Sequence, residues 1–245
     1  MPSETDFQRL MISLHIPKTG GQSFMRVLES LTPHGFIPDY ENRPISPDAV
    51  LRRIKQFRTD MARMALVTEQ LRDREGPVIV HGHFISGKYR SVFPGAQFLT
   101  WLREPVERVC SHYAYWARFR KLKTGEGHAK MLTLEEFAAQ ENRQNIQSRF
   151  LAHTRLDGFD FLGITDQFER SLRLFAAWSA TELVETPSMN RYVNSGGYSL
   201  SPEIRSRIEA FNSLDMDLYA RGLERFEALC EEHGLSTESG CAEKR

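Results

Sequence analysis

The chain lacks three features: net charge, a disulfide framework and a long apolar run. Its 32 lysines and arginines are balanced by 32 aspartates and glutamates, which argues against a general nucleic-acid or membrane-surface binder. Three cysteines make no framework, and their odd number favours reduced thiols. No segment approaches the roughly 20 apolar residues that a membrane-spanning helix needs. A length of 245 residues suits one domain with one sizeable core.

A turn with one lysine and two glycines follows the first apolar run and precedes a helical pattern. It consists of Pro17, Lys18, Thr19, Gly20, Gly21, Gln22 and Ser23. The backbone N–H groups of such a turn and the positive end of the helix dipole point at an anion, and Lys18 adds a full positive charge. A Walker A loop places its lysine after the last glycine, whereas here the lysine comes first. The turn therefore predicts an anion site of another kind; a tight turn that only opens a helix is the alternative.

A second anion-binding pattern starts at Arg103. An apolar run over 97–102 reads as a buried strand, and Pro105 suits the first turn of the helix that follows. Arg103 is thus expected at the carboxyl end of a strand, where open α/β sheets bind ligands. Together with Ser111, about two turns into the helix, its guanidinium could hold a phosphate. A surface ion pair and a serine bonded to its own helix are the alternatives.

The third pattern is a pair of histidines at the end of a β-branched run, Val78-Ile79-Val80-His81-Gly82-His83. Side chains two apart on a strand share a face, so His81 and His83 are expected to point into one site. A neutral imidazole is a suitable general base for a hydroxyl. His-x-His is also a metal-ligand pattern, but the chain offers no clear third and fourth ligand. Two core histidines at a strand end are the remaining alternative.

In this order the first two patterns resemble the donor-binding motifs of sulfotransferases, the enzymes that use 3′-phosphoadenosine 5′-phosphosulfate (PAPS). The resemblance implies that Arg103 and Ser111 hold the 3′-phosphate of PAPS. It also implies that the 5′ end is held by Lys18, Thr19, Gly20, Gly21, Gln22 and Ser23. Gln22 stands where the family more often has threonine, and Glu104 where it more often has aspartate. The likeness runs in order from about residue 10 to residue 230.

The His-Gly-His segment resembles the branch of that family that sulfates heparan-type chains at a 2-O position. By this resemblance His83 is the catalytic base, His81 a supporting partner, and the acceptor a carbohydrate such as a glycan or glycoconjugate. Golgi members of the family need an amino-terminal anchor. Because no signal peptide or anchor precedes the first apolar run, we expect a soluble, cytoplasmic enzyme of bacterial type, or a chain whose anchor has been removed.

The spacing of apolar residues predicts an α/β fold: a single domain over 1–233 and a frayed tail over 234–245. A mostly parallel central sheet, flanked by helices as in nucleotide kinases, is implied by the resemblance. Residues 33–47 and 84–95 read as loops because of their prolines, glycines and polar residues. The expected strands are an apolar run at 11–16 and segments 78–83, 97–102 and 159–165. The expected helices include 48–74, 133–140, 142–152, 202–213, 215–232 and one that Asp166 caps.

The resemblance, together with these residues, implies transfer of a sulfuryl group from PAPS to an acceptor hydroxyl. His83 would take the hydroxyl proton, and Lys18 would stabilise charge on the departing phosphate, so no metal is required. One alternative is a nucleotide-dependent kinase with a variant phosphate loop. That enzyme would need Mg²⁺ and an acidic residue at a strand end, and no convincing one is present. The other is a nucleotide-binding module without catalysis, which the intact site residues argue against.

Overall fold

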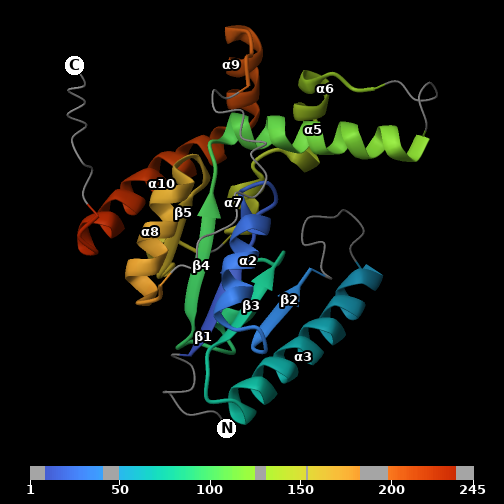
Figure 1. Cartoon of the computed structure of the whole chain (residues 1–245). Helices are drawn as coiled ribbons and strands as arrows, with labels where there is room; N and C mark the ends of the chain where they lie inside the picture. The colour runs from blue at the N-terminus through green and yellow to red at the C-terminus, as the bar shows by residue number, and fades with distance from the viewer. Residues whose placement is uncertain (1–8, 41–49, 125–130, 153, 183–197, 236–245) are drawn as a thin grey trace, which may run out of the picture.

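A computed structural model describes residues 9–40, 50–124, 131–152, 154–182 and 198–235 of the chain. Five parallel strands form one sheet in the order β2-β3-β1-β4-β5 (Figure 1). The strands are β1 (Leu10–Leu14), β2 (Phe36–Asp39), β3 (Val78–Gly82), β4 (Gln97–Leu102) and β5 (Phe161–Ile164). Nearly every strand residue is buried, as expected when helices cover a parallel sheet. The predicted α/β fold with a parallel sheet is confirmed.

Strand order places the ligand-binding end of the sheet between β1 and β4. The chain leaves β1 toward β2 at one edge, and it leaves β4 toward β5 at the other edge. The connections therefore turn in opposite directions at two neighbouring strands, whose carboxyl ends lie at the same edge of the sheet. Such a switch point is where open α/β sheets bind their ligands.

Helices surround the sheet and extend beyond its carboxyl end. In Figure 1, α8 and α10 lie beside β5, and α5 runs across the carboxyl end with α6 and α9 next to it; α3 packs against β3. The α-helices are α2 (Gly21–Leu31), α3 (Val50–Asp73), α4 (Gly87–Arg90), α5 (Pro105–Thr124), α6 (Leu134–Ala138), α7 (Ile146–Phe150), α8 (Phe168–Ser179), α9 (Pro202–Phe211) and α10 (Ser213–Glu232). The short 3-10 turns are η1 (Glu141–Arg143), η2 (Leu156–Gly158) and η3 (Thr165–Gln167).

Aromatic rings hold α2 and α8 against the sheet. Phe24 of α2 is fully buried, with its ring centroid 5.0 Å from that of Trp101 and 5.9 Å from that of Phe161. The ring centroid of Phe175 on α8 lies 5.0 Å from that of Phe24, and the two rings meet edge to face. Buried aromatic pairs add roughly 1 kcal/mol each beyond area burial. This packing fixes α2, and with it the turn that joins β1 to α2.

Three sequence expectations about elements are wrong. Residues 36–39 of the expected loop form β2; Pro38 is tolerated there because β2 is an edge strand of the sheet. Residues 87–90 of the other expected loop form the short α4. Asp166 does not cap α8, whose N-cap is Gln167. The capping box of Thr133 and Glu136 at α6 is confirmed.

The predicted domain boundary stays a prediction, because residues 236–245 lie outside the described part of the chain. Within the residues that are described, no helix is both long enough and apolar enough to cross a bilayer.

Candidate functional site

The turn between β1 and α2, residues 17–21, is here called the Lys18 loop. Lys18 has φ 73° and Gly20 has φ 81°, both left-handed values. Glycine adopts this conformation without penalty, whereas a lysine there costs roughly 1–2 kcal/mol. Thr19 is fully buried, and its Oγ1 donates to the carbonyl of Ile16 at 2.9 Å. The hydroxyl therefore ties the loop into shape and does not point to solvent.

The end of the Lys18 loop opens toward an anion. A Cβ atom at Gly21 would lie 2.0 Å from Cδ2 of His15, so only glycine fits there. The α2 helix starts without a side-chain cap, which leaves its first amides and its dipole available to a ligand. Gln22 is exposed and Ser23 is half-buried at this end. Backbone groups, more than side chains, thus make up the predicted anion site.

The ammonium group of Lys18 contacts a residue of α5. Its Nζ lies 4.6 Å from the ring centroid of Tyr115. Partial burial, and then the positive charge of Arg103, lower the pKa of Lys18 below its usual value. Because the charge of Arg103 acts on Lys18, an anion between or beside these two cations is favoured.

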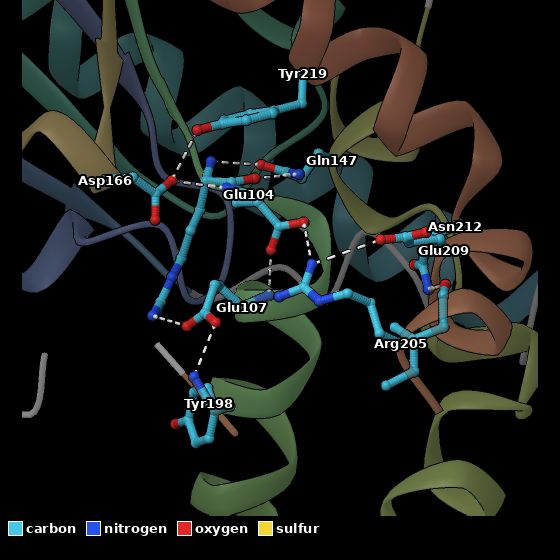
Figure 2. A network of polar contacts seen from close by, with 11 residues as sticks. Glu104, Glu107, Gln147, Asp166, Tyr198, Arg205, Glu209, Asn212 and Tyr219 are labelled. Atoms are coloured by element: carbon cyan, nitrogen blue, oxygen red, sulfur yellow. Dashed lines mark hydrogen bonds and ion pairs between the residues drawn. The ribbon is translucent and has the colours of Figure 1, made fainter. Parts of the chain in front are cut away.

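Arg103 directly follows β4, as predicted, and its backbone is held by Gln147. The amide oxygen of Gln147 accepts from Arg103 N at 2.9 Å, and Nε2 donates to the Arg103 carbonyl at 2.9 Å (Figure 2). The guanidinium donates to the carbonyl of Lys18 at 3.4 Å and lies 3.7 Å from Glu107. Ser111 is half-buried on α5, two turns further along. The structure thus brings Arg103 to the Lys18 loop.

A network of carboxylates fixes the residues that follow Arg103. Glu104 N and the hydroxyl of Tyr219 both donate to Oδ2 of Asp166, at 2.8 and 3.0 Å (Figure 2). Glu107 N donates to the carboxylate of Glu104 at 2.7 Å, and Glu107 in turn accepts from Tyr198 N at 3.0 Å. Asp166, expected to cap its own helix, therefore holds the start of α5 instead.

Two helices cap each other behind Gln147. The buried carboxylate of Asp215 accepts from the backbone amides of Gln147 and Ser148, at 3.0 and 2.7 Å, and so caps α7. Asn145 reciprocates, because its Oδ1 accepts from the amides of Leu214 and Asp215 at the start of α10. Asn and Asp are strong capping residues, which is the signal that could have suggested this pairing. The sequence alone did not show that the two caps exchange partners.

His83 has its proton placement set by the backbone. Its Nδ1 lies 2.6 Å from the carbonyl oxygen of His15. A carbonyl only accepts, so Nδ1 carries the hydrogen and the neutral ring keeps Nε2 as an acceptor. Burial lowers the pKa of His83, while the His15 carbonyl and the charge of Asp39 oppose that shift. His83 is therefore neutral and basic at Nε2 near pH 7.

His81 lies deeper than His83. It is only 1% exposed, and its Nδ1 lies 2.8 Å from Oγ of Ser13 on the neighbouring strand. Burial lowers the pKa of His81 to about 3. The structure places this ring in the packed sheet, so a supporting part in catalysis stays a prediction.

His15 and Tyr40, to which the sequence patterns gave no role, lie in one cluster with His81 and His83. The His15 ring stacks on His81 at 5.2 Å and lies 4.4 Å from His83. Its Nδ1 is 2.9 Å from the hydroxyl of Tyr40, whose ring stands edge-on to His83 at 4.8 Å. Burial lowers the pKa of His15 well below its usual value and raises that of Tyr40. Tyr40 follows β2, the strand that the sequence reading missed.

The sheet orders these groups across its carboxyl end. Strands β3, β1 and β4 are neighbours, so the Lys18 loop lies between His83 on one side and Arg103 on the other. All three predicted groups therefore meet at the switch point. Among the described residues, no group of three or more histidine, cysteine, aspartate or glutamate side chains is arranged to hold a metal ion.

Comparison with known proteins gives one family. A profile described as "Sulfotransferase family" matches residues 5–220. The solved sulfotransferase of Alicyclobacillus acidocaldarius is 18% identical, with 91% of this chain and 96% of that chain covered and a TM-score of 0.51. Mouse sulfotransferase SULT7A1, solved with PAP, is 11% identical over 84% of this chain and 63% of that chain, with a TM-score of 0.36. No curated protein matches the chain.

Proposed function

The chain belongs to the sulfotransferase family, and we propose that it moves the sulfuryl group of PAPS to a hydroxyl of a carbohydrate acceptor. The observation that carries the proposal is the meeting of the Lys18 loop, Arg103 and His83 at three adjacent strand ends. An anion loop, a second cation and a neutral base are the parts that such a transfer needs.

Donor binding in this proposal uses both cationic segments. The open amides of α2 and the ammonium of Lys18 receive the 5′-phosphosulfate. Arg103 and Ser111 receive the 3′-phosphate. The Nε of Arg103 supports this role, because it is buried and finds no hydrogen-bond partner among the residues that the structure describes. A buried unpaired N–H is costly, and an anionic oxygen would satisfy it.

The transfer step is an in-line displacement at sulfur. The acceptor oxygen forms a bond to sulfur while the bond between sulfur and the bridging oxygen of the 5′-phosphate breaks. That oxygen leaves with the bonding electron pair as part of 3′-phosphoadenosine 5′-phosphate (PAP). Nε2 of His83 takes the hydroxyl proton, and Lys18 with the loop amides stabilises the charge that grows on the leaving phosphate. The chain itself thus supplies the positive charge, without a metal ion.

An exposed aromatic pair supports a sugar as the acceptor. Tyr115 and Phe119 lie one turn apart on α5 and are 57% and 46% exposed. Their rings are 6.2 Å apart and nearly parallel, at 17°. An exposed aromatic ring beside Lys18 can stack on the apolar face of a sugar ring, which would bring a sugar hydroxyl toward the reacting sulfur. The likeness of His-Gly-His to the heparan 2-O branch supports the same acceptor class.

The proposal is tested by calorimetry with PAP and AMP. We expect PAP to bind more tightly, because each charge-assisted bond to the 3′-phosphate adds about 1.5–3 kcal/mol. Arg103→Ala should remove most of the difference, while the exposed Arg221→Ala serves as the control. Equal affinity of the wild-type protein for PAP and AMP would contradict the assignment of the donor.

A further inference from the structure

Two segments that the proposed function assigns to opposite ends of PAPS follow neighbouring strands. The Lys18 loop follows β1, and Arg103 follows β4. These strands pair in parallel as far as Leu14 and Thr100, so the hydrogen bonds of the sheet stop before either segment. The distance between the two segments is therefore set by contacts outside the sheet.

Thr165 provides such a contact. It directly follows β5, the strand that pairs with β4. Its Oγ1 lies 2.8 Å from the carbonyl oxygen of Thr19 and 3.0 Å from that of Leu102. Both partners only accept, so the hydroxyl donates and shares its single hydrogen between them. One side chain thereby joins the Lys18 loop to the end of β4.

A second contact between the segments competes with donor binding. The guanidinium of Arg103 donates to the carbonyl of Lys18 at 3.4 Å. This bond is long, and it uses the group that the 3′-phosphate would engage. When the guanidinium turns toward a phosphate, the hydroxyl of Thr165 still holds the loop beside the strand end.

The other half of Thr165 packs without polar contacts. Its methyl carbon lies against Gly20, where a Cβ atom would be 3.5 Å away. Valine has the same shape as threonine and keeps this packing, so Thr165→Val removes the hydroxyl alone. Serine does the reverse, because it keeps the hydroxyl and loses the methyl group.

We propose that Thr165 is a positioning residue that sets the distance between the two phosphate-binding ends of the donor site. This inference rests on the proposed function. A nucleotide with phosphates at both ends needs the two segments at a fixed distance, whereas a nucleotide with one phosphate uses only one segment. Thr165 therefore determines how much better the site binds a bisphosphate than either monophosphate.

The test measures Kd for PAP, AMP and adenosine 3′-phosphate by calorimetry. We expect Thr165→Val to weaken PAP binding about three- to tenfold, the size of one lost hydrogen bond. The two monophosphates should keep nearly their wild-type affinity. Thr165→Ser should restore PAP binding, and Thr165→Ala should repeat the selective loss. Thr68→Val is the control, because it removes a hydroxyl bond to the Met64 carbonyl in α3 and should change none of the three affinities.

Two results would overturn the inference: unchanged PAP binding in Thr165→Val, or an equal loss for all three nucleotides. The second result would mean that the hydroxyl only stabilises the fold. If the wild-type protein itself does not prefer PAP to the monophosphates, the proposed function fails and this inference with it. The wild-type measurement thus separates the two failures.

Discussion

Replacement of His83 by asparagine tests the proposed base at Nε2 separately from the hydrogen bond that Nδ1 makes to the backbone. The Nδ2 of asparagine can take the place of Nδ1 and donate to the His15 carbonyl, which His83 does at 2.6 Å. Asparagine has no group that accepts a proton in the place of Nε2. His83→Asn should therefore remove the base and keep the hydrogen bond, whereas His83→Ala removes both.

The size of the effect follows from these roles. A general base contributes about 10²- to 10⁴-fold, so both variants should lose that much in kcat. The backbone hydrogen bond is worth about 1 kcal/mol of stability, which His83→Ala should lose and His83→Asn should keep. PAP affinity should stay nearly unchanged in both, because the donor segments follow β1 and β4 and not β3. His34→Ala, at an exposed histidine, is the control.

The dependence of kcat/KM on pH should report the protonation of His83. Only neutral His83 can accept a proton, so kcat/KM should rise with pH and level off once the ring is deprotonated. Because burial lowers the pKa of His83, the midpoint of the rise should lie below the ordinary 6.5. The rise should vanish in His83→Asn. Near-wild-type kcat in that variant, or a dead but folded His81→Gln enzyme, would refute His83 as the base.

Lys18→Ala should lower kcat by about a hundredfold, more than it weakens PAP binding, because the negative charge on the departing phosphate grows only in the transition state. A change confined to KM in steady-state kinetics would make Lys18 a binding residue. Tyr115→Ala should raise KM for a glycan acceptor and leave the PAP Kd unchanged in calorimetry; equal KM values would remove the stacking role. Burial lowers the pKa of His81 to about 3, whereas an unfolded histidine has about 6.5, so the unfolded chain binds more protons and stability is lost as the pH falls. The free energy of unfolding, measured with urea, should be about 2 kcal/mol lower at pH 5 than at pH 7 because of this group. That part of the pH dependence should be absent in His81→Gln. Activity should survive EDTA; a loss that added zinc restores would count against the role of His83.

The parts of the site that the sequence predicted are those that sit within one continuous segment. Lys18, Arg103 and His83 each follow an apolar strand, and each motif contains its own chemistry. The strands themselves were visible because parallel strands are apolar on both faces. The short edge strand β2 was not, because Gly35 and Pro38 read as loop residues.

The parts that were missed depend on contacts between distant segments. Asp166 looks like a helix cap in sequence, yet its carboxylate reaches Glu104, 62 residues away. Asp215 and Asn145 cap each other's helices across a similar separation. Tyr40 joins His15 only because β2 pairs beside β3. No local pattern shows which distant backbone group a capping side chain will accept from, so these partners came from the fold alone.

The central claim is that the chain transfers sulfate from PAPS, and side-by-side transfer from two labelled donors tests it most directly. The wild-type protein is incubated with a panel of glycans and with either radiolabelled PAPS or γ-labelled ATP and Mg²⁺, with His83→Asn and Lys18→Ala as matched controls. The account predicts label from PAPS on a glycan, release of PAP, and strong loss in both variants. Label from ATP with none from PAPS would contradict it.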